Sequence, residues 1–440
     1  MNKNAFNAAF RSYVRDNLTP TQDERDFVSL VYNSVQQVLG VANSLQIGSF
    51  PRYTAITPLH DLDVLFVLGN WDREHHDPSQ ALEDLERQMR AEYENPTHYE
   101  VHIGRQTHSV TIRFLDGEEE VFSVDVVPAY INGQNEFGDD TYVVPEIARA
   151  SRVERQQIRE AVRSGQREMG WIKSDPRGYI AIASQTNAQN DDFRKAVKLV
   201  KGWRCAHKER NDSFALKSFH LEQAITTWVQ QNPRAEMFDI VFEFFRRVPD
   251  FVRYPQFPDR ADSDRNIDDY VNDLNEQDRI LIIQARDAFL VGLEKFDEGD
   301  DVGDLLSLPP RPRARGSEEF LFDQGIPVLT EAEFSIVGHV QPRDGGFRAF
   351  FLDAVGLINV DRKIEFRLGQ NPPVADIFKW KVKNDDGCDQ PRGEITDHQT
   401  KNDPESTRHN GNHYVECFAI RNGICVARSR QNVILRRPGQ

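Results

Sequence analysis

The sequence predicts an α+β protein in which a mixed sheet with helices is followed by a helical second lobe and a small all-β, sandwich-like domain. Three observations lead to this prediction. Helical and strand patterns are mixed over about the first 150 residues, and residues 151–298 then show mainly helical spacing. Residues 330–440 alternate apolar and polar side chains between turn clusters such as KNDDG and RNG, which is typical of short antiparallel strands.

The chain has 440 residues, 39% of them hydrophobic, which is enough for two or three domains with their own cores. We expect four parts. Residues 1–170 form the core with its N-terminal helices, and residues 171–300 form a helical lobe that completes a cleft. Residues 301–317 are a Pro/Arg-rich linker containing LLSLPPRPRARG, and residues 318–440 are the β domain.

Charge and cysteine usage limit the classes of partner. The net charge of −16 opposes binding to duplex DNA, which usually depends on a basic excess. No apolar run approaches the ~20 residues of a membrane span, and the N-terminus lacks a signal-peptide core, so we expect a soluble, cytoplasmic protein without a membrane partner. The four cysteines form no CxxC pair. We interpret them as free thiols, although Cys388, Cys417 and Cys425 could gather with His409 and His413.

The elements of the first half follow from periodicity and end signals. A helix is expected over 21–39, with Thr21 as its cap and Gly40 as its stop. The run DLDVLFVL at 61–68 is a covered strand, because its centre is continuously apolar. Further helices are expected at 5–17, 78–92, 193–207, 214–231 and 273–296, and further strands at about 98–104, 108–114 and 121–127.

Asp61 and Asp63 stand two residues apart on the predicted strand and therefore project from the same face. Two such carboxylates repel each other unless a cation lies between them. Asp125 is a third acid, within the apolar strand sequence VFSVDVVPAY. An acid there is costly unless it is paired or metal-bound, so we expect it on a neighbouring strand, where it completes a two-metal site.

Gly48 and Ser49 precede Asp61, with Ser49 twelve residues before it. Glycine allows close approach of the backbone to a phosphate, and a serine hydroxyl with backbone N–H groups at a helix start can hold phosphate oxygens. Neither GS nor DxD is specific alone, and a lone DxD is usually a surface pair. The set of GS, DxD and a later strand aspartate predicts a nucleotidyltransferase.

These motifs resemble the DNA polymerase β-like nucleotidyltransferase superfamily. More narrowly, GSFPRYTAITPLHDLDVLFVL and FSVDVVPA are similar to the cyclic GMP–AMP synthase/DncV-like enzymes (CD-NTases) of bacterial antiphage signalling (CBASS). The resemblance implies that Lys198 and Ser218 hold the nucleotide triphosphate and that Phe219 stacks on a base. From the residues alone, Lys198 would be a solvated helix lysine, Ser218 a helix cap and Phe219 a core residue.

The C-terminal part is similar to the adenylyl/guanylyl cyclase and SMODS C-terminal sensor (AGS-C) domain. The resemblance rests on WKV with Asn384, on RG at 392–393, on GNHYVEC at 411–417 and on GICVA at 423–427. Trp380, Tyr414 and Arg392 either line a ligand pocket or are core and rim residues, and we favour the second interpretation.

The resemblance implies an Mg-dependent enzyme with two Mg²⁺ ions, for which Mn²⁺ can substitute, held by Asp61, Asp63 and Asp125. Its substrates would be NTPs, ATP foremost, condensed into a cyclic or linear oligonucleotide second messenger with release of pyrophosphate. A downstream effector protein would respond to the product. Two alternatives are transfer of a single nucleotide to a protein or RNA, and a catalytically silent nucleotide-binding regulator.

Overall fold

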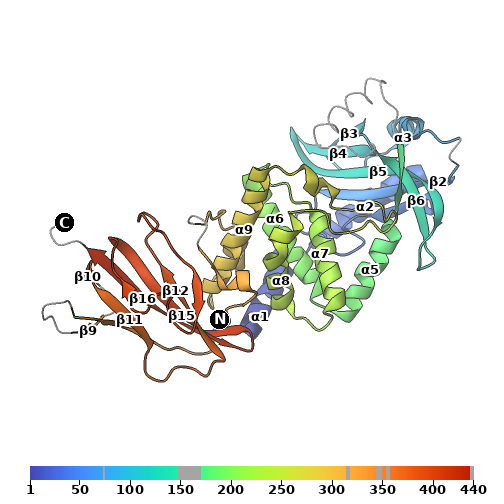
Figure 1. Ribbon diagram of the computed structural model, residues 1–440. Coiled ribbons are helices and arrows are strands. Elements are labelled where there is room, and N and C mark those ends of the chain that lie inside the picture. The colour runs from blue at the N-terminus through green and yellow to red at the C-terminus, as the bar shows by residue number, and fades with distance from the viewer. Residues whose placement is uncertain (73–74, 147–169, 314–317, 343–348, 353–356, 437–440) are drawn as a thin grey trace. The chain divides into compact units, whose positions relative to one another are not determined.

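The computed structural model describes residues 1–72, 75–146, 170–313, 318–342, 349–352 and 357–436 (Figure 1). These residues form two compact units. One comprises Ala9–Ile280, and the other comprises Met1–Ala8 together with Leu281–Gln440. The four-part division expected from the sequence stays a prediction.

The unit Ala9–Ile280 contains a seven-stranded mixed sheet. Five strands follow the order β1-β2-β5-β4-β3, and β6 joins β5 to β7. The pair β2/β5 is parallel, whereas β1/β2 and β4/β5 are antiparallel. The strands are β1 Ser44–Ile47, β2 Asp61–Asn70, β3 Glu100–Arg105, β4 Val110–Asp116, β5 Glu119–Gln134, β6 Asp140–Glu146 and β7 Gly170–Ser174.

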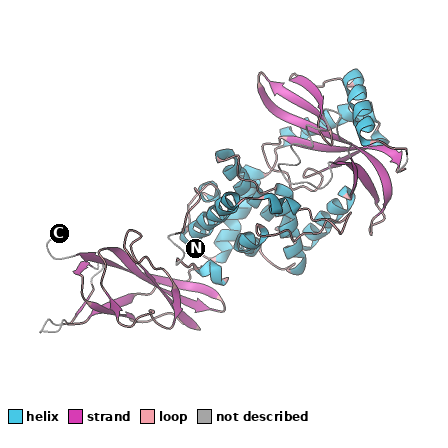
Figure 2. Cartoon of the chain, turned by 45° about the horizontal axis from the view of Figure 1, so that its top comes forward, coloured by secondary structure: helices cyan, strands magenta, loops and turns pink. Residues whose placement is uncertain are grey.

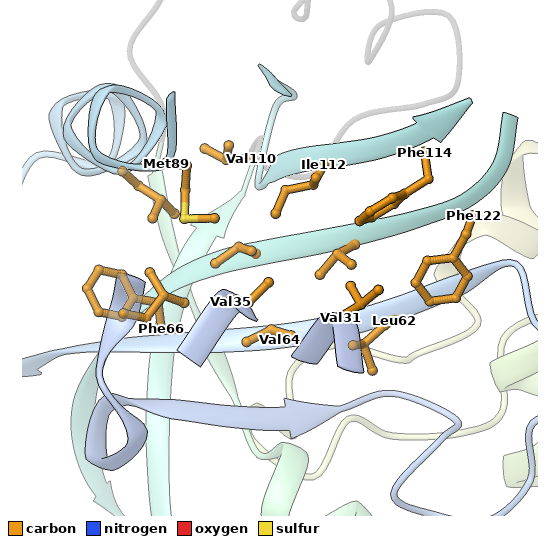
Figure 3. Packing of buried hydrophobic residues seen from close by; sticks show 14 of the residues in the cluster. Val31, Val35, Leu62, Val64, Phe66, Met89, Val110, Ile112, Phe114 and Phe122 are labelled. Carbon is orange, nitrogen blue, oxygen red and sulfur yellow. The ribbon is translucent and has the colours of Figure 1, made fainter. Parts of the chain in front are cut away.

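One face of this sheet is covered by α2 Gln22–Leu39 and α3 Pro78–Glu92. Figure 3 shows the apolar cluster, in which Val31 and Val35 of α2 and Met89 of α3 pack with side chains from β2, β4 and β5. Leu62, Val64 and Phe66 are the β2 residues in this cluster. Because strand side chains alternate, Asp61 and Asp63 must lie on the opposite face.

The opposite face carries a smaller apolar cluster centred on Leu65, Ala129 and Tyr142. Val67 and Val127 pack against it. The acidic positions 61, 63 and 125 therefore precede apolar positions on the same face of β2 and β5. This pattern places the carboxylates at the start of the parallel strand pair.

The ends of α2 confirm the predictions that Thr21 caps the helix and that Gly40 ends it. The hydroxyl of Thr21 accepts a hydrogen bond from the amide of Glu24, and the Glu24 carboxylate accepts one from the amide of Thr21. This reciprocal capping box satisfies two amides at the helix start. Gly40 ends the helix with φ of 84°, which is readily available only to glycine.

The second half of this unit is helical, as expected, with three differences in extent. The predicted helix at 193–207 spans Phe193–Arg210. The predicted helix at 214–231 begins only at Ser218, because residues 214–217 lie outside it, and the predicted helix at 273–296 spans Glu276–Lys295. Strands β6 and β7 were not predicted. The helices are α5 Pro176–Gln189, α6 Phe193–Arg210, α7 Ser218–Gln231, α8 Met237–Phe251 and α9 Glu276–Lys295, which continues into the second unit.

At the N-terminus, the predicted helix 5–17 is α1 Lys3–Tyr13 followed by a π-helical turn Val14–Leu18. Inside the expected linker, α10 covers Val302–Leu306. Arg313 then forms ion pairs with Asp287 and Asp323 at 2.6 and 2.8 Å. Across the described ranges, no helix combines the length and apolar character needed to cross a bilayer.

The C-terminal β region consists of two facing sheets, which appear as the magenta strands in the lower left of Figure 2. One has the order β10-β16-β15-β12-β13 and the other β14-β11-β8-β9. Both sheets contribute to one core, for example Phe366 from the second and Trp380 and Val415 from the first. This packing confirms the predicted sandwich-like domain.

These strands are β8 Ile336–Val340, β9 Phe350–Phe351, β10 Leu357–Asn359, β11 Lys363–Leu368, β12 Ile377–Lys383, β13 Ile395–Asp397, β14 Glu405–Ser406, β15 Gly411–Arg421 and β16 Ile424–Arg436. All four cysteines are free thiols, and Cys417 and Cys425 are buried in this domain.

Candidate active site

Asp63 and Asp125 are register partners on the parallel strands β2 and β5. Neighbouring partners in a sheet project from the same face, so their carboxylates stand side by side. Asp61, two residues before Asp63, projects from that face as well and is exposed. The structure thus puts the three predicted carboxylates on one face of the sheet, at the start of the strand pair.

The electrostatic state of Asp63 reflects this crowding. Burial, followed by the charges of Asp61 and Asp125, raises the pKa of Asp63 to about 6, while Arg52 opposes the shift. A carboxyl group perturbed by like charges in this way gains from a nearby cation.

Asp125 is oriented by two hydroxyl groups. Thr111, its register partner on the antiparallel strand β4, donates a hydrogen bond to Oδ1 at 2.5 Å, and Ser109 donates to the same oxygen at 3.1 Å. Both donors are buried. Both hydrogen bonds restrain the Asp125 carboxylate through its Oδ1 atom.

Gly48 follows β1 and lies against Asp63. Its φ is 76°, in the left-handed region, and a Cβ atom added there would lie 2.9 Å from Cγ of Asp63. Ile47, the preceding residue, is the register partner of Asp63 on β2. Both the backbone conformation and the lack of space require glycine at position 48.

Ser49 begins a loop of turns and not a helix, which corrects the expected helix start. Its carbonyl oxygen accepts a hydrogen bond from the amide of Thr54 at 3.1 Å, and the carbonyl of Phe50 accepts one from Tyr53 at 2.9 Å. Residues 48–53 are turns and bends throughout. Any phosphate held here would contact loop amides and the Ser49 hydroxyl.

A buried ion network ties this loop to the helical lobe. We use this name for Arg52, Thr54, Lys201 and Glu222. The Glu222 carboxylate on α7 accepts hydrogen bonds from Arg52 at 2.6 Å, from Thr54 at 2.8 Å and from Lys201 of α6 at 2.9 Å. Lys201 also donates to the backbone carbonyl of Thr54 at 3.0 Å.

Burial alone would raise the pKa of Glu222, but the charges of Lys201 and Arg52 outweigh it and lower the pKa to about 2. All four side chains are buried. Buried charges are tolerated when they are paired and hydrogen-bonded, as they are here. The network therefore holds the Gly48–Thr54 loop in one position relative to α6 and α7.

Ser218 and Phe219 are the first two residues of α7 and are half-buried. The Arg52 guanidinium lies 5.1 Å from the centre of the Phe219 ring, and the Tyr179 ring meets it edge-on at 4.9 Å. The start of α7 thus packs against the loop that follows Ser49. Phe219 is not a fully buried core residue.

Lys198 lies on α6 one turn before Lys201. Its Nζ donates to the hydroxyl of Thr19 at 3.4 Å. Burial, and then Arg25, Arg194 and Lys201, lower the pKa of Lys198 to about 8. The structure therefore surrounds Lys198 with like charges, an environment that favours a bound anion.

The donor set suits a hard divalent cation, since it consists of carboxylate oxygens. Among the described residues, no three His, Cys, Asp or Glu side chains converge closely enough to hold a metal ion alone. Mg²⁺ usually keeps waters and takes substrate phosphates beside one or two carboxylates. Asp61, Asp63 and Asp125 would hold ions in that manner, with phosphate oxygens completing the coordination.

Sequence reasoning missed Ser109, Thr111, Arg52, Lys201 and Glu222. Two of them had a usable signal. Glu222 lies four residues after Ser218 and so shares a face of the helix, and Lys201 lies three residues after Lys198. Ser109 and Thr111 could not be found in this way, because only the strand register puts them beside Asp125.

Residues 316–436 match the family described as the adenylyl/guanylyl and SMODS C-terminal sensor domain. The match covers the whole two-sheet region described above. These residues therefore belong to that family.

A probable cyclic nucleotide synthase of Bacillus cereus (strain VD146) is 24% identical over 200 residues, which are 40% of this chain. The match spans only 54% of that relative's length. Together with the family match, this similarity confirms the predicted recognition of a CD-NTase-like chain with an AGS-C domain.

Two solved structures match this chain at low identity. The Escherichia coli MS115-1 CdnC structure with ATP has a TM-score of 0.49 at 15% identity and covers 68% of this chain and 97% of its own. The E. coli DncV structure in its 3'-deoxy GTP bound form has a TM-score of 0.46 at 14% identity and covers 68% and 99%.

Proposed function

We propose that the protein condenses NTPs into a cyclic or linear oligonucleotide second messenger and releases pyrophosphate. The observation that carries this proposal is the placement of Asp61, Asp63 and Asp125 on adjoining strands, with Gly48 packed against Asp63. The similarity to a probable cyclic nucleotide synthase supports the choice of product class.

The reaction requires a ribose hydroxyl to attack the α-phosphorus of an NTP. A new oxygen–phosphorus bond forms, the bond to the pyrophosphate oxygen breaks, and the hydroxyl proton is lost. Two Mg²⁺ ions, or Mn²⁺ in their place, would make the hydroxyl a better nucleophile and stabilise the leaving pyrophosphate. Asp125 is the acid that we place nearest the hydroxyl.

The chain's other residues position the donor NTP. The amides of the Gly48–Thr54 loop and the Ser49 hydroxyl hold phosphate oxygens, and Lys198 and Ser218 contact the triphosphate. Phe219 offers a ring for stacking of a base. The buried ion network holds the loop and the start of α7 at a fixed position relative to each other. Phosphoryl transfer depends chiefly on positioning of this kind.

We further propose that the protein acts in antiphage defence, with NTPs as substrates, ATP foremost, and with an effector protein that responds to the product. The C-terminal domain would regulate synthesis. A cytoplasmic location fits these substrates.

The test incubates the full chain with each labelled NTP and with mixtures, in Mg²⁺ or Mn²⁺, and identifies the products by mass spectrometry. We expect oligonucleotides with one pyrophosphate released for each bond formed. The double variant Asp61→Asn/Asp63→Asn should fold and be inactive. Label transferred only to a protein or RNA would favour single-nucleotide transfer. Tight NTP binding without pyrophosphate release would favour a silent regulator.

A further inference from the structure

The C-terminal domain contains a cavity of about 460 Å³ between its two sheets. Phe366 of β11, Val382 of β12, Val415 of β15 and Leu435 of β16 form its apolar walls. Small-molecule sites commonly have volumes of this order. Polar side chains make up much of the remaining lining, among them Asn384, Arg392 and Glu405.

The inner faces of the sandwich turn polar at this cavity. Glu405 is the register partner of Ile364, and His413 is the partner of Val433, and all four residues are buried. Register partners share a face, so Glu405 and His413 point into the space between the sheets, where a packed core would carry apolar side chains.

Glu405 is held in place by Arg392, another residue of the cavity lining. The two guanidinium nitrogens donate to its carboxylate at 2.8 and 3.3 Å. A buried ion pair generally stabilises a fold less than apolar packing of the same volume. Its presence here indicates a polar recognition surface. Arg392 belongs to the cavity lining and Trp380 to the core, and Arg430 lies over the ring of Tyr414.

Two further cations line the cavity with exposed side chains, Lys363 and Arg408. Within the ranges that the structure describes, neither side chain has an ion-pair partner. Arg392 is paired with Glu405 and also with Glu394, which in turn pairs with Lys401. Lys363 and Arg408 are therefore the lining cations that we consider for an anion. Long basic side chains at a rim can reach a charged group outside an apolar pocket.

We propose that this cavity binds a phosphorylated organic molecule of about the size of a mononucleotide. The planar organic part would lie against Phe366 and Val415, with its polar edge toward Arg392, Glu405 and Asn384, which also line the cavity. The phosphate would lie at the mouth, near Lys363 and Arg408. This proposal does not depend on the proposed enzymatic activity.

The test measures binding of AMP, GMP, CMP and UMP, and of the matching uncharged nucleosides, to the full chain by calorimetry in EDTA. Omitting divalent ions and triphosphates disfavours binding at the carboxylate site. We expect at least one monophosphate to bind, its nucleoside to bind at least about tenfold more weakly, and its affinity to fall with added salt.

Variants then locate the site. Lys363→Ala/Arg408→Ala should weaken binding of that monophosphate at least about tenfold. Asn384→Ala should weaken binding of both the monophosphate and its nucleoside. The matched control is Lys401→Ala, an exposed lysine that pairs with Glu394 and does not line the cavity. It should bind normally, as should Lys198→Ala in the other unit.

Three results would overturn the proposal. One is that no monophosphate binds. Another is that nucleosides bind as tightly as monophosphates. The third is that Lys198→Ala, and not the cavity variants, abolishes binding. Melting curves of each variant identify any that do not fold, and the remaining variants in the set still decide the outcome.

Discussion

Asp63 on β2 and Asp125 on β5 are register partners of a parallel strand pair, and their side chains lie next to each other on one face of the sheet. They lie 62 positions apart in the chain, since 125 − 63 = 62, and the sheet brings them together on one face. Thr111 extends the same row on β4 as the partner of Asp125. This row of two acids and a hydroxyl is the part of the molecule on which the catalytic proposal depends.

Replacing Asp63 with Asn should reduce nucleotidyl transfer by at least about 10³-fold. It should also remove charge repulsion, so the variant should melt no lower than the wild type at pH 8. Since the folded pKa of Asp63 is raised to about 6, the cost of ionising it is present above pH 6 and disappears as the pH falls toward 4. If Asp63→Asn melts at a higher temperature than the wild type at pH 8, this difference in melting temperature should therefore be smaller at pH 4.5. Asp116→Asn, at an exposed hairpin tip, is the matched control and should change neither the rate of nucleotidyl transfer nor the melting temperature.

Divalent ions should raise the melting temperature of the unit Ala9–Ile280 when a nonhydrolysable NTP analogue is present. At 100 times Kd, binding adds about 2.7 kcal/mol, which corresponds to several degrees. Protons compete with metal ions for Asp63, so the shift should be larger at pH 7.5 than at pH 5. An equal shift in Asp61→Asn/Asp63→Asn, measured by scanning fluorimetry, would show that the ions bind elsewhere.

Gly48→Ala should lower both stability and activity, because a side chain there requires a strained φ and meets Asp63. Gly117→Ala is the matched control, with φ of 65° and nothing within 4 Å of the added Cβ. The control should lose about 1–2 kcal/mol of unfolding free energy without loss of activity. Gly48→Ala should lose more stability and at least about 100-fold in kcat. Equal activities of the two variants would show that Asp63 tolerates displacement.

Thr111→Val should lower kcat about tenfold with little change in KM, because Asp125 loses a hydrogen bond that orients it. Thr111→Ser keeps the hydroxyl and should restore most of the activity. Ser109→Ala should have a similar but smaller effect, in keeping with its longer bond of 3.1 Å. A Thr111→Ser enzyme as slow as Thr111→Val would point to packing and not to hydrogen bonding.

Glu222→Gln should destabilise the protein by about 3–5 kcal/mol, because Lys201 and Arg52 are left buried without a counter-charge. The control Glu243→Gln removes a partly exposed pair with Arg246 and should cost less than about 1 kcal/mol. The pKa of Glu222 is lowered from 4.5 to about 2, so its contribution is complete above pH 4.5 and is lost as the pH falls toward 2. Urea unfolding between pH 3 and 7 should show the gap between wild type and Glu222→Gln narrowing in acid.

The KM for NTP should rise above pH 8 as Lys198, with its pKa of about 8, loses its proton. Lys198→Arg should move this rise to higher pH, because guanidinium stays charged. Lys198→Ala should raise KM at all pH values and remove the increase of KM above pH 8. A KM that rises identically in wild type and Lys198→Ala would assign the titration to another group.

Local sequence patterns were enough to predict four features: the strand at residues 61–68, the capped helix at 21–39, the two-sheet C-terminal domain and the face on which Asp61 and Asp63 project. These features are set by local periodicity and by end signals such as Thr21 and Gly40, which act over a few residues. The sequence also singled out Asp125, because a carboxylate in an apolar strand needs a partner.

The surroundings of these residues depend on how distant strands and helices pack in the folded chain. The register of β4, β5 and β2 puts Thr111, Asp125 and Asp63 in one row, and helix packing brings Lys201 and Glu222 to Arg52. The tertiary structure also showed that Ser49 begins a loop of turns, and that Arg392 faces a cavity. Pairings of this kind depend on which distant strands and helices meet, and local sequence patterns carry no information about that choice.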